Sequence, residues 1–201
     1  MRTLLLIFVT SIATSSFAED GPLTTFKFTE ITDVDISEYE QMLEHACSLG
    51  CAIGWEYKCS STLAPQNGNN YAGKNLGDSK LATAWVEGAN GYGIGQKIDI
   101  VFQDGENLKN IPFRGISIVN GYAKSDTAWK TNARVKTMKL YHNEKPIMTL
   151  ELLDTRLPQE VSFGAISVSA RDVVSLEILD VYKGTKYQDT AISEINLYGA
   201  H

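Results

Sequence analysis

Short runs of alternating apolar and polar residues, separated by glycine, asparagine and aspartate, constrain the fold of this chain more than any other feature. The clearest runs cover residues 97–102, 148–152 and 191–197. A period of two places every second side chain on the same face of a β-strand. No helical pattern lies between the runs, which argues against βαβ units and a parallel sheet. We therefore predict a mainly β fold, an antiparallel β-sandwich.

The segment before these runs has the period of a helix instead. Within residues 36–49, five apolar side chains fall on one stripe: Tyr39, Met42, Leu43, Ala46 and Leu49. Asp35 or Ser37 can cap the start of this helix, and Gly50 can end it. We expect one short helix here as a cap on the sandwich, and no second helix. Residues 19–35 are polar and show no regular pattern.

The first 18 residues have the three parts of a secretory signal peptide. Arg2 supplies a positive charge, and residues 4–12 supply an apolar stretch too short to span a bilayer. Ser16 and Ala18 place small side chains before a cleavage site at Glu19. This pattern predicts a secreted protein, and it leaves open whether the destination is the periplasm or the extracellular space.

The length of 201 residues suits about one globular domain, and 43% hydrophobic residues suffice for one core. We divide the chain into a signal peptide (1–18), an N-terminal segment with the helix and a cysteine cluster (19–56), and a β-sandwich (57–201). The net charge of −6, without a basic run, argues against nucleic acid and anionic lipid as partners. No internal apolar run approaches the roughly 20 residues that span a membrane.

Three cysteines lie within 13 residues, at Cys47, Cys51 and Cys59. In an exported protein they can form a disulfide, and the odd number leaves one thiol over. Cys47, Cys51 and the nearby His45 could also bind zinc, but a fourth ligand is missing from the pattern. We favour a local disulfide or buried cysteines, and the pairing stays open.

Three long loops carry aromatic and polar side chains, at residues 63–79, 85–95 and 121–134. Long loops in a compact domain are more often functional than idle. A pyranose has an apolar C–H face on which tyrosine or tryptophan can stack, and a rim of hydroxyls for polar side chains. The candidate sugar-binding residues are Glu87, Tyr92, Asn120, Tyr122, Trp129, Asn132 and Arg134. Trp85, between Ala84 and Val86, is instead interpreted as a core residue.

A turn near residue 80 can supply hard oxygen ligands. Asp78, the Thr83 hydroxyl and backbone carbonyl groups suit Ca²⁺, especially if the distant carboxylate of Glu194 completes the shell. The alternative is that Asp78 only caps its own turn.

The sequence shows no recognisable catalytic constellation. Its three histidines, His45, His142 and His201, have no evident nucleophile partner. Glu87 and Glu194 could form a carboxylate pair for glycoside hydrolysis, but nothing in the sequence sets their separation. We interpret them as a surface acid and a structural acid, and we expect no enzymatic activity.

Five segments in order carry a resemblance to a known family: 59–73, 75–95, 118–122, 132–136 and 179–197. Together they resemble the NADase-type glycan-binding, or translocation, domain of an NAD-glycohydrolase toxin, a discoidin-like (F5/8 type C) domain. The resemblance covers residues 57–198. Two departures are Ser79, where glycine follows the aspartate in the family, and Cys59, where a small residue such as alanine is common.

The resemblance implies a galactose-binding-like jelly-roll sandwich that recognises carbohydrate through loops at one end. Related sugar modules often hold a structural Ca²⁺, and the positions of its ligands match Asp78, Thr83 and Glu194. The motifs match no part of the toxin's catalytic domain, so NAD hydrolysis is not implied.

We therefore expect a secreted, non-catalytic glycan-binding module with a structural Ca²⁺. The alternative is a module that binds protein, as a translocation partner of a toxin or as a ligand of a surface receptor. Competition by free sugar would separate these two hypotheses.

Overall fold

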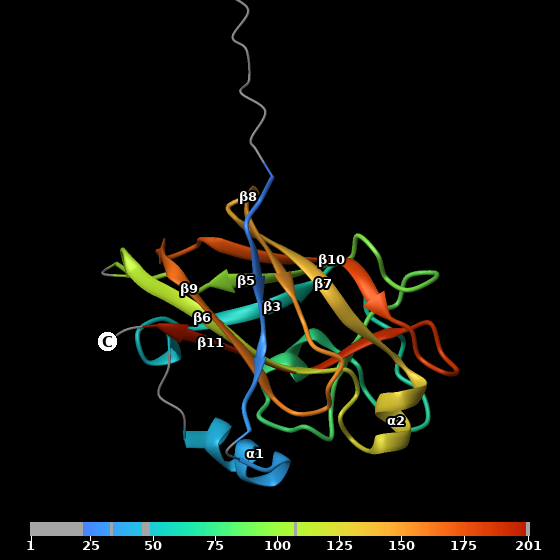
Figure 1. Cartoon of the computed structure of the whole chain (residues 1–201). Coiled ribbons are helices and arrows are strands. Elements are labelled where there is room, and N and C mark those ends of the chain that lie inside the picture. The colour runs from blue at the N-terminus through green and yellow to red at the C-terminus, as the bar shows by residue number, and fades with distance from the viewer. Residues whose placement is uncertain (1–21, 33, 46–48, 107, 200–201) are drawn as a thin grey trace, which may run out of the picture.

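The computed structural model describes residues 22–32, 34–45, 49–106 and 108–199, and far more of these residues lie in strands than in helices (Figure 1). They form eleven strands, two α-helices and two 3₁₀-helices. In chain order the elements are β1 (Thr25–Lys27), β2 (Thr29–Glu30), α1 (Ile36–His45), η1 (Leu49–Cys51), β3 (Trp55–Cys59), η2 (Gly73–Gly77), β4 (Trp85–Val86), β5 (Lys97–Phe102), β6 (Ile111–Asn120), α2 (Asp126–Thr131), β7 (Ala133–His142), β8 (Lys145–Glu151), β9 (Gln159–Val168), β10 (Val173–Tyr182) and β11 (Thr190–Gly199).

The strands form one branched network of pairs that folds into two layers. One layer has the order β1-β8-β7-β10-β5-β3, and the other has β2-β9-β6-β11-β4. The layers join where β11 pairs in parallel with β7, through only Thr190 with Ala133 and Ala191 with Arg134. All other pairs except β1 with β8 are antiparallel. The predicted mainly β, antiparallel sandwich is confirmed.

The alternation seen in the sequence becomes the core between the layers. On β5, buried Ile98, Ile100 and Phe102 alternate with half-buried neighbours. Ile98 pairs with Leu176 of β10, so the apolar faces of adjacent strands coincide. Trp85 is fully buried in the same core, which confirms its interpretation as a core residue.

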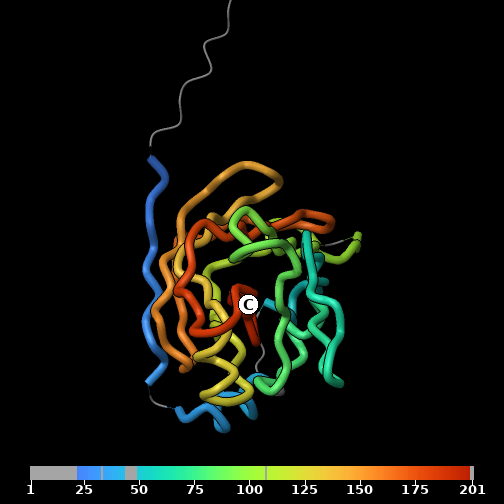
Figure 2. Tube along the Cα trace, turned by 90° about the vertical axis from the view of Figure 1, so that its right-hand side faces the viewer, coloured from blue at the N-terminus to red at the C-terminus, as the bar shows by residue number. Residues whose placement is uncertain are grey.

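The N-terminal segment is more ordered than its polar sequence suggests. β1 pairs with β8 and β2 pairs with β9, so the segment runs along the outside of both layers (Figures 1 and 2). Between them Phe28 is buried in the main core, and its N–H donates to the Glu151 carbonyl at 2.9 Å. Strands of two and three residues are too short to show a period, which is why the sequence does not reveal them.

The predicted N-terminal helix is present as α1. Asp35 caps it, because its carboxylate accepts from the N–H groups of Ser37 and Glu38 at 2.8 and 2.9 Å. The Glu38 carboxylate accepts in return from the N–H of Asp35, which completes a capping box. Tyr39 is buried, and its hydroxyl donates to Ser117 Oγ at 2.8 Å. α1 ends at His45, four residues before the predicted end, and residues 46–48 are not described.

The expectation of no second helix is wrong. Six residues within the predicted loop 121–134 form α2, whose N-cap Ser125 accepts from the N–H of Ala128 at 3.1 Å. A helix of this length completes fewer than two turns, so it leaves no apolar stripe in the sequence. Both helices lie at the same edge of the sandwich (Figures 1 and 2).

Several expectations fall outside the described residues. These include the signal peptide and Cys47, so the disulfide pairing and the zinc alternative stay predictions. Cys59 on β3 has a free thiol, and burial raises its pKa to about 12. Among the described residues, no helix has the length and apolar character needed to cross a membrane.

Candidate functional site

Three loops at one end of the sandwich enclose a cavity of about 270 Å³. We call it the tyrosine cavity. Its lining residues are Leu63, Gln66, Asn67, Asn69, Tyr71, Val86, Tyr122, Ala128, Thr131, Asn132, Tyr187 and Asp189. They come from the connections between β3 and η2, between β6 and β7, and between β10 and β11, and from Val86 on β4. Segments far apart in the sequence therefore build one site.

Three tyrosines give the cavity its aromatic surface. The rings of Tyr71 and Tyr122 pack edge to face, with centroids 6.3 Å apart, and both are buried. Tyr187 is 42% exposed, so its ring is open to solvent. The Tyr122 hydroxyl and the Lys124 ammonium donate to Asn69 Oδ1, at 3.5 and 3.1 Å. Aromatic rings and hydrogen-bonding groups thus share one small space.

The polar wall contains Asn132 and Asp189. Asn132 caps the end of α2, where its side-chain amide donates to the Ala128 carbonyl at 2.8 Å. Asp189 is the charged member of the lining, and its backbone carbonyl accepts from the N–H of Ala133 at 3.0 Å. Both positions are fixed by backbone contacts, so their side chains are held at the wall.

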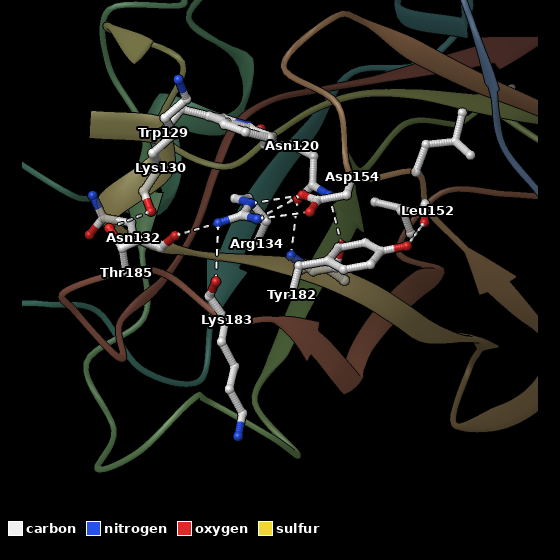
Figure 3. Close-up of polar contacts among 12 residues, drawn as sticks. Asn120, Trp129, Lys130, Asn132, Arg134, Leu152, Asp154, Tyr182, Lys183 and Thr185 are labelled. Carbon is white, nitrogen blue, oxygen red and sulfur yellow. Dashed lines mark hydrogen bonds and ion pairs between the residues drawn. The ribbon is translucent and has the colours of Figure 1, made fainter. Parts of the chain in front are cut away.

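Behind the cavity, Arg134 joins the surrounding loops (Figure 3). Its guanidinium makes a bidentate ion pair with Asp154 at 2.8 and 2.9 Å, and lies over the Trp129 ring, 4.4 Å from the centroid. It also donates to the carbonyls of Asn132 and Lys183, at 3.1 and 3.4 Å. One buried side chain therefore ties α2 to the loops that follow β8 and β10.

Asn120 and Trp129 belong to the same support. The Asn120 amide donates to the Val135 carbonyl at 2.7 Å and its oxygen accepts from the Val135 N–H at 3.0 Å. The Trp129 indole N–H donates to the Asn120 carbonyl at 2.9 Å, as Figure 3 shows. Asn120, Trp129 and Arg134 do not line the tyrosine cavity, and their role in sugar binding stays a prediction.

Glu87 and Tyr92 lie in the neighbouring glycine-rich loop. Glu87 is fully buried, and its carboxylate accepts from the N–H groups of Ala89 and Thr190 at 2.7 and 3.5 Å. Burial raises the pKa of Glu87, and the nearby Asp189 charge adds to this effect. The Tyr92 carbonyl accepts from the Thr190 hydroxyl at 2.8 Å, and the Lys183 ammonium lies over its ring. These two residues hold the loop rather than line the cavity.

Of the predicted sugar-binding residues, the structure places Tyr122 and Asn132 in the tyrosine cavity. Sequence reasoning missed Asn69, Tyr71, Tyr187 and Asp189. Asn69 and Tyr71 belong to the predicted functional loop 63–79, so the signal for them was present. Nothing local marks Tyr187 and Asp189, because only the pairing of β11 with its neighbours brings them to this end.

The predicted metal ligands gather on the turn after η2. The Thr83 hydroxyl lies 2.9 Å from both carboxylate oxygens of Asp78 and 2.9 Å from the Lys80 carbonyl. One hydroxyl proton cannot serve three acceptors, so this turn holds more oxygens than donors. Ser79 has φ +57°, a conformation that favours glycine, which explains why glycine is usual at this position.

Glu194 on β11 faces the same turn. This residue is 3% exposed, and its Oε2 has no hydrogen-bond partner among the described residues. Burial raises its pKa to about 9, and the charge of Asp78 acts in the same direction, whereas the Ser79 N–H opposes it. Glu194 also lines a second cavity of about 540 Å³ between β3, η2 and β11.

This set of oxygens fits Ca²⁺, which takes about six to eight oxygen ligands. Two carboxylates, one hydroxyl and one carbonyl converge, and one buried oxygen lacks a partner. The described residues contain no group of three or more histidine, cysteine or acidic side chains that could hold a metal. A cation here would therefore depend on the neutral oxygens of Thr83 and Lys80 as well.

Glu87 and Glu194 do not form a shared site for hydrolysis. Glu194 lines the second cavity, of which Glu87 is not a lining residue. Both carboxyls are buried, so the interpretation of one of them as a surface acid is wrong, and they have separate partners on different loops.

Several solved structures have the same fold, and three of them are compared with this chain. The CBM32-1 and CBM32-2 domains of Clostridium perfringens ZmpB, in complex with GalNAc, cover 91% of this chain at 13% identity and a TM-score of 0.59. The chain spans only 41% of that structure. CpGH89CBM32-5 from the same organism, in complex with GalNAc-β-1,3-galactose, covers 72% of this chain and 94% of its own, at 17% identity and a TM-score of 0.50.

The third structure is the arabinofuranosyltransferase AftD from mycobacteria, which covers 73% of this chain and 11% of its own, at 14% identity and a TM-score of 0.52. At these identities the likeness shows the fold alone. No curated protein matches the chain. The family described as "NAD glycohydrolase translocation F5/8 type C domain" matches residues 51–198. Because this match covers well over half of the 201 residues, the chain belongs to the NAD glycohydrolase translocation F5/8 type C domain family.

Proposed function

We propose that the protein is a secreted, non-catalytic module that binds glycans in the tyrosine cavity. The observation that carries this proposal is that three tyrosines, several side-chain amides and one carboxylate line one space of about 270 Å³. That volume is at the small end for ligand sites, and it suits one terminal sugar of a longer chain. The two Clostridium perfringens structures of the same fold hold GalNAc and GalNAc-β-1,3-galactose, which supports this ligand class.

The residues divide the recognition between them. The exposed ring of Tyr187 can stack on the C–H face of a pyranose, while buried Tyr71 and Tyr122 form the apolar wall behind it. Asn69 and Asp189 can bond the hydroxyl rim. Arg134 and its partners then act on binding only by holding α2 and the adjacent loops in place.

Calcium has a structural role in this proposal. Asp78, Thr83, the Lys80 carbonyl and Glu194 would hold the ion, which would neutralise two carboxylates and link the turn after η2 to β11. An ion that binds only the folded state stabilises it.

A second candidate function is the binding of a protein partner during translocation. The name of the family carries this alternative. In that case the same loops would contact protein, and free sugars would not compete.

A glycan array with the purified protein tests the first proposal. Selective binding of a few related glycans, competed by the free sugar, is expected. Tyr187→Ala should weaken this binding at least about tenfold, because stacking on an exposed ring contributes on the order of 1 kcal/mol or more. Tyr141→Ala is the matched control, since Tyr141 lies at the other end of β7. A blank array with folded protein, or equal loss in both variants, would contradict the proposal.

A further inference from the structure

We propose that Asp189 makes the tyrosine cavity selective for uncharged sugars that present adjacent free hydroxyls, and that it excludes sugars with an anionic group on that edge. This inference rests on the proposed glycan-binding function and names the ligand class of the same site. The proposed function requires only that the loops are aromatic and polar, whereas this inference assigns the selectivity to one residue.

The backbone around Asp189 is fixed on both sides. Its carbonyl accepts from the Ala133 N–H at 3.0 Å, and the next residue, Thr190, is fully buried. The Thr190 hydroxyl donates to the Tyr92 carbonyl at 2.8 Å. The partly exposed Asp189 side chain therefore starts from a rigid position in the cavity wall.

No basic side chain neutralises this carboxylate among the described residues, whose ion pairs all lie elsewhere. Two basic residues beside the cavity have other contacts. Lys124 donates to Asn69 Oδ1 at the cavity wall, and the Lys186 ammonium lies over the Tyr187 ring, 4.8 Å from its centroid. The charge of Asp189 is also felt by the buried Glu87 carboxyl. The lining thus carries an uncompensated negative charge.

A carboxylate is an acceptor of hydrogen bonds only, with two oxygens side by side. Adjacent hydroxyls of a neutral pyranose can each donate to one oxygen, and bonds to a charged acceptor are stronger than neutral ones. A sulfate, or the carboxylate of a sialic acid, has no proton to donate at neutral pH and would meet a like charge. Like charges at contact distance in this setting reduce affinity by about tenfold or more.

Matched glycans test this selectivity. Each neutral array member is printed beside its sulfated and its sialylated form, and the apparent dissociation constants are compared. The wild type should bind the neutral form at least about tenfold more tightly. Asp189→Asn should bring this ratio to below about threefold, because the isosteric amide keeps one acceptor and removes the charge. Asp104→Asn removes an equal charge just after the C-terminal end of β5, where Asp104 pairs with Arg171. This control variant should leave the ratio unchanged.

The outcomes separate this inference from the function on which it rests. No binding of any glycan overturns the proposed function. Binding that needs Tyr187 but keeps the same ratio in Asp189→Asn overturns only the role of Asp189. A wild type that prefers the anionic forms also overturns it, and would point to Lys124 and Lys186 as the determinants.

Discussion

The guanidinium of Arg134 lies over the Trp129 ring, 4.4 Å from its centroid. Cation–π contacts of this kind are worth about 0.5–2 kcal/mol, more when desolvated. The contact turns the indole toward the protein interior, where its N–H donates to Asn120. Two side chains that the sequence suggests for sugar contact thus support the cavity from behind.

The ion pair behind this contact should contribute strongly to stability. Arg134 is 8% exposed at its side chain, whereas Asp154 is 39% exposed. Asp154→Asn keeps one acceptor oxygen but removes the negative charge and the bidentate pairing, so the nearly buried guanidinium loses its counter-charge. We expect a loss of about 2–3 kcal/mol in the free energy of unfolding, measured by urea denaturation.

The exposed pair of Lys136 and Asp180 provides the control. Their side chains are 43% and 53% exposed, at a similar distance of 2.8 Å. Asp180→Asn should cost no more than about 0.5 kcal/mol, because exposed pairs are screened by solvent. Equal losses in the two variants would show that burial of Arg134 does not set the strength of its ion pair.

Trp129→Ala should act on stability more than on affinity. The substitution removes the indole bond to Asn120 and the contact with Arg134, with an expected loss of about 2–4 kcal/mol. At a temperature where the variant is still folded, glycan affinity should fall by less than about threefold. Isothermal titration calorimetry and thermal unfolding on the same samples check this. A larger loss of affinity at unchanged stability would place Trp129 in direct contact with sugar.

The periodic parts of the chain were predictable from sequence. The alternation at Ile98 and Ile100 predicts a strand with one buried face, and Asp35 marks the start of α1. Such signals are local, so one sequence suffices. The segment around buried Phe28 was not predictable in this way. The strands on either side of it, β1 and β2, are too short to show a period, and only their pairing with β8 and β9 reveals them.

The site was predictable in its loops but not in the direction of its side chains. Asn120 and Arg134 are polar residues at the two ends of the loop between β6 and β7, where the sequence suggests that they contact sugar. Their bonds go to Val135 and Asp154, which are 15 and 20 positions away along the chain. Side-chain orientation of this kind depends on tertiary neighbours, and Asp189 lines the cavity for the same reason.

Glu87 should make the stability of the protein depend on pH. Burial raises its pKa above the ordinary value of 4.5, so the folded state binds a proton that the unfolded chain releases. The stability linked to this group is complete below pH about 4.5 and falls as pH rises toward the raised pKa. Glu87→Gln should remove this loss. Its free energy of unfolding relative to wild type, from urea denaturation, should therefore improve between pH 5 and pH 8. A constant difference across this range would contradict the assignment.

Calcium should raise the melting temperature of the wild type, and a chelator should reverse the effect. At a free concentration about 100 times the dissociation constant, an ion bound only to the folded state adds about 2.7 kcal/mol. Asp78→Asn and Glu194→Gln each remove a charged ligand. The melting temperature of each variant should therefore be the same with calcium as without it.

Asp104→Asn serves as the control for that measurement, because it removes a carboxylate that pairs with Arg171 and lies away from the turn after η2. It should keep the full calcium-dependent shift. In chelator, Glu194→Gln should also melt above the wild type, since the neutral amide removes the cost of burying an acid whose pKa is raised to about 9. A wild type that melts at one temperature in both conditions would show that Asp78, Thr83 and Glu194 hold the turn by hydrogen bonds alone.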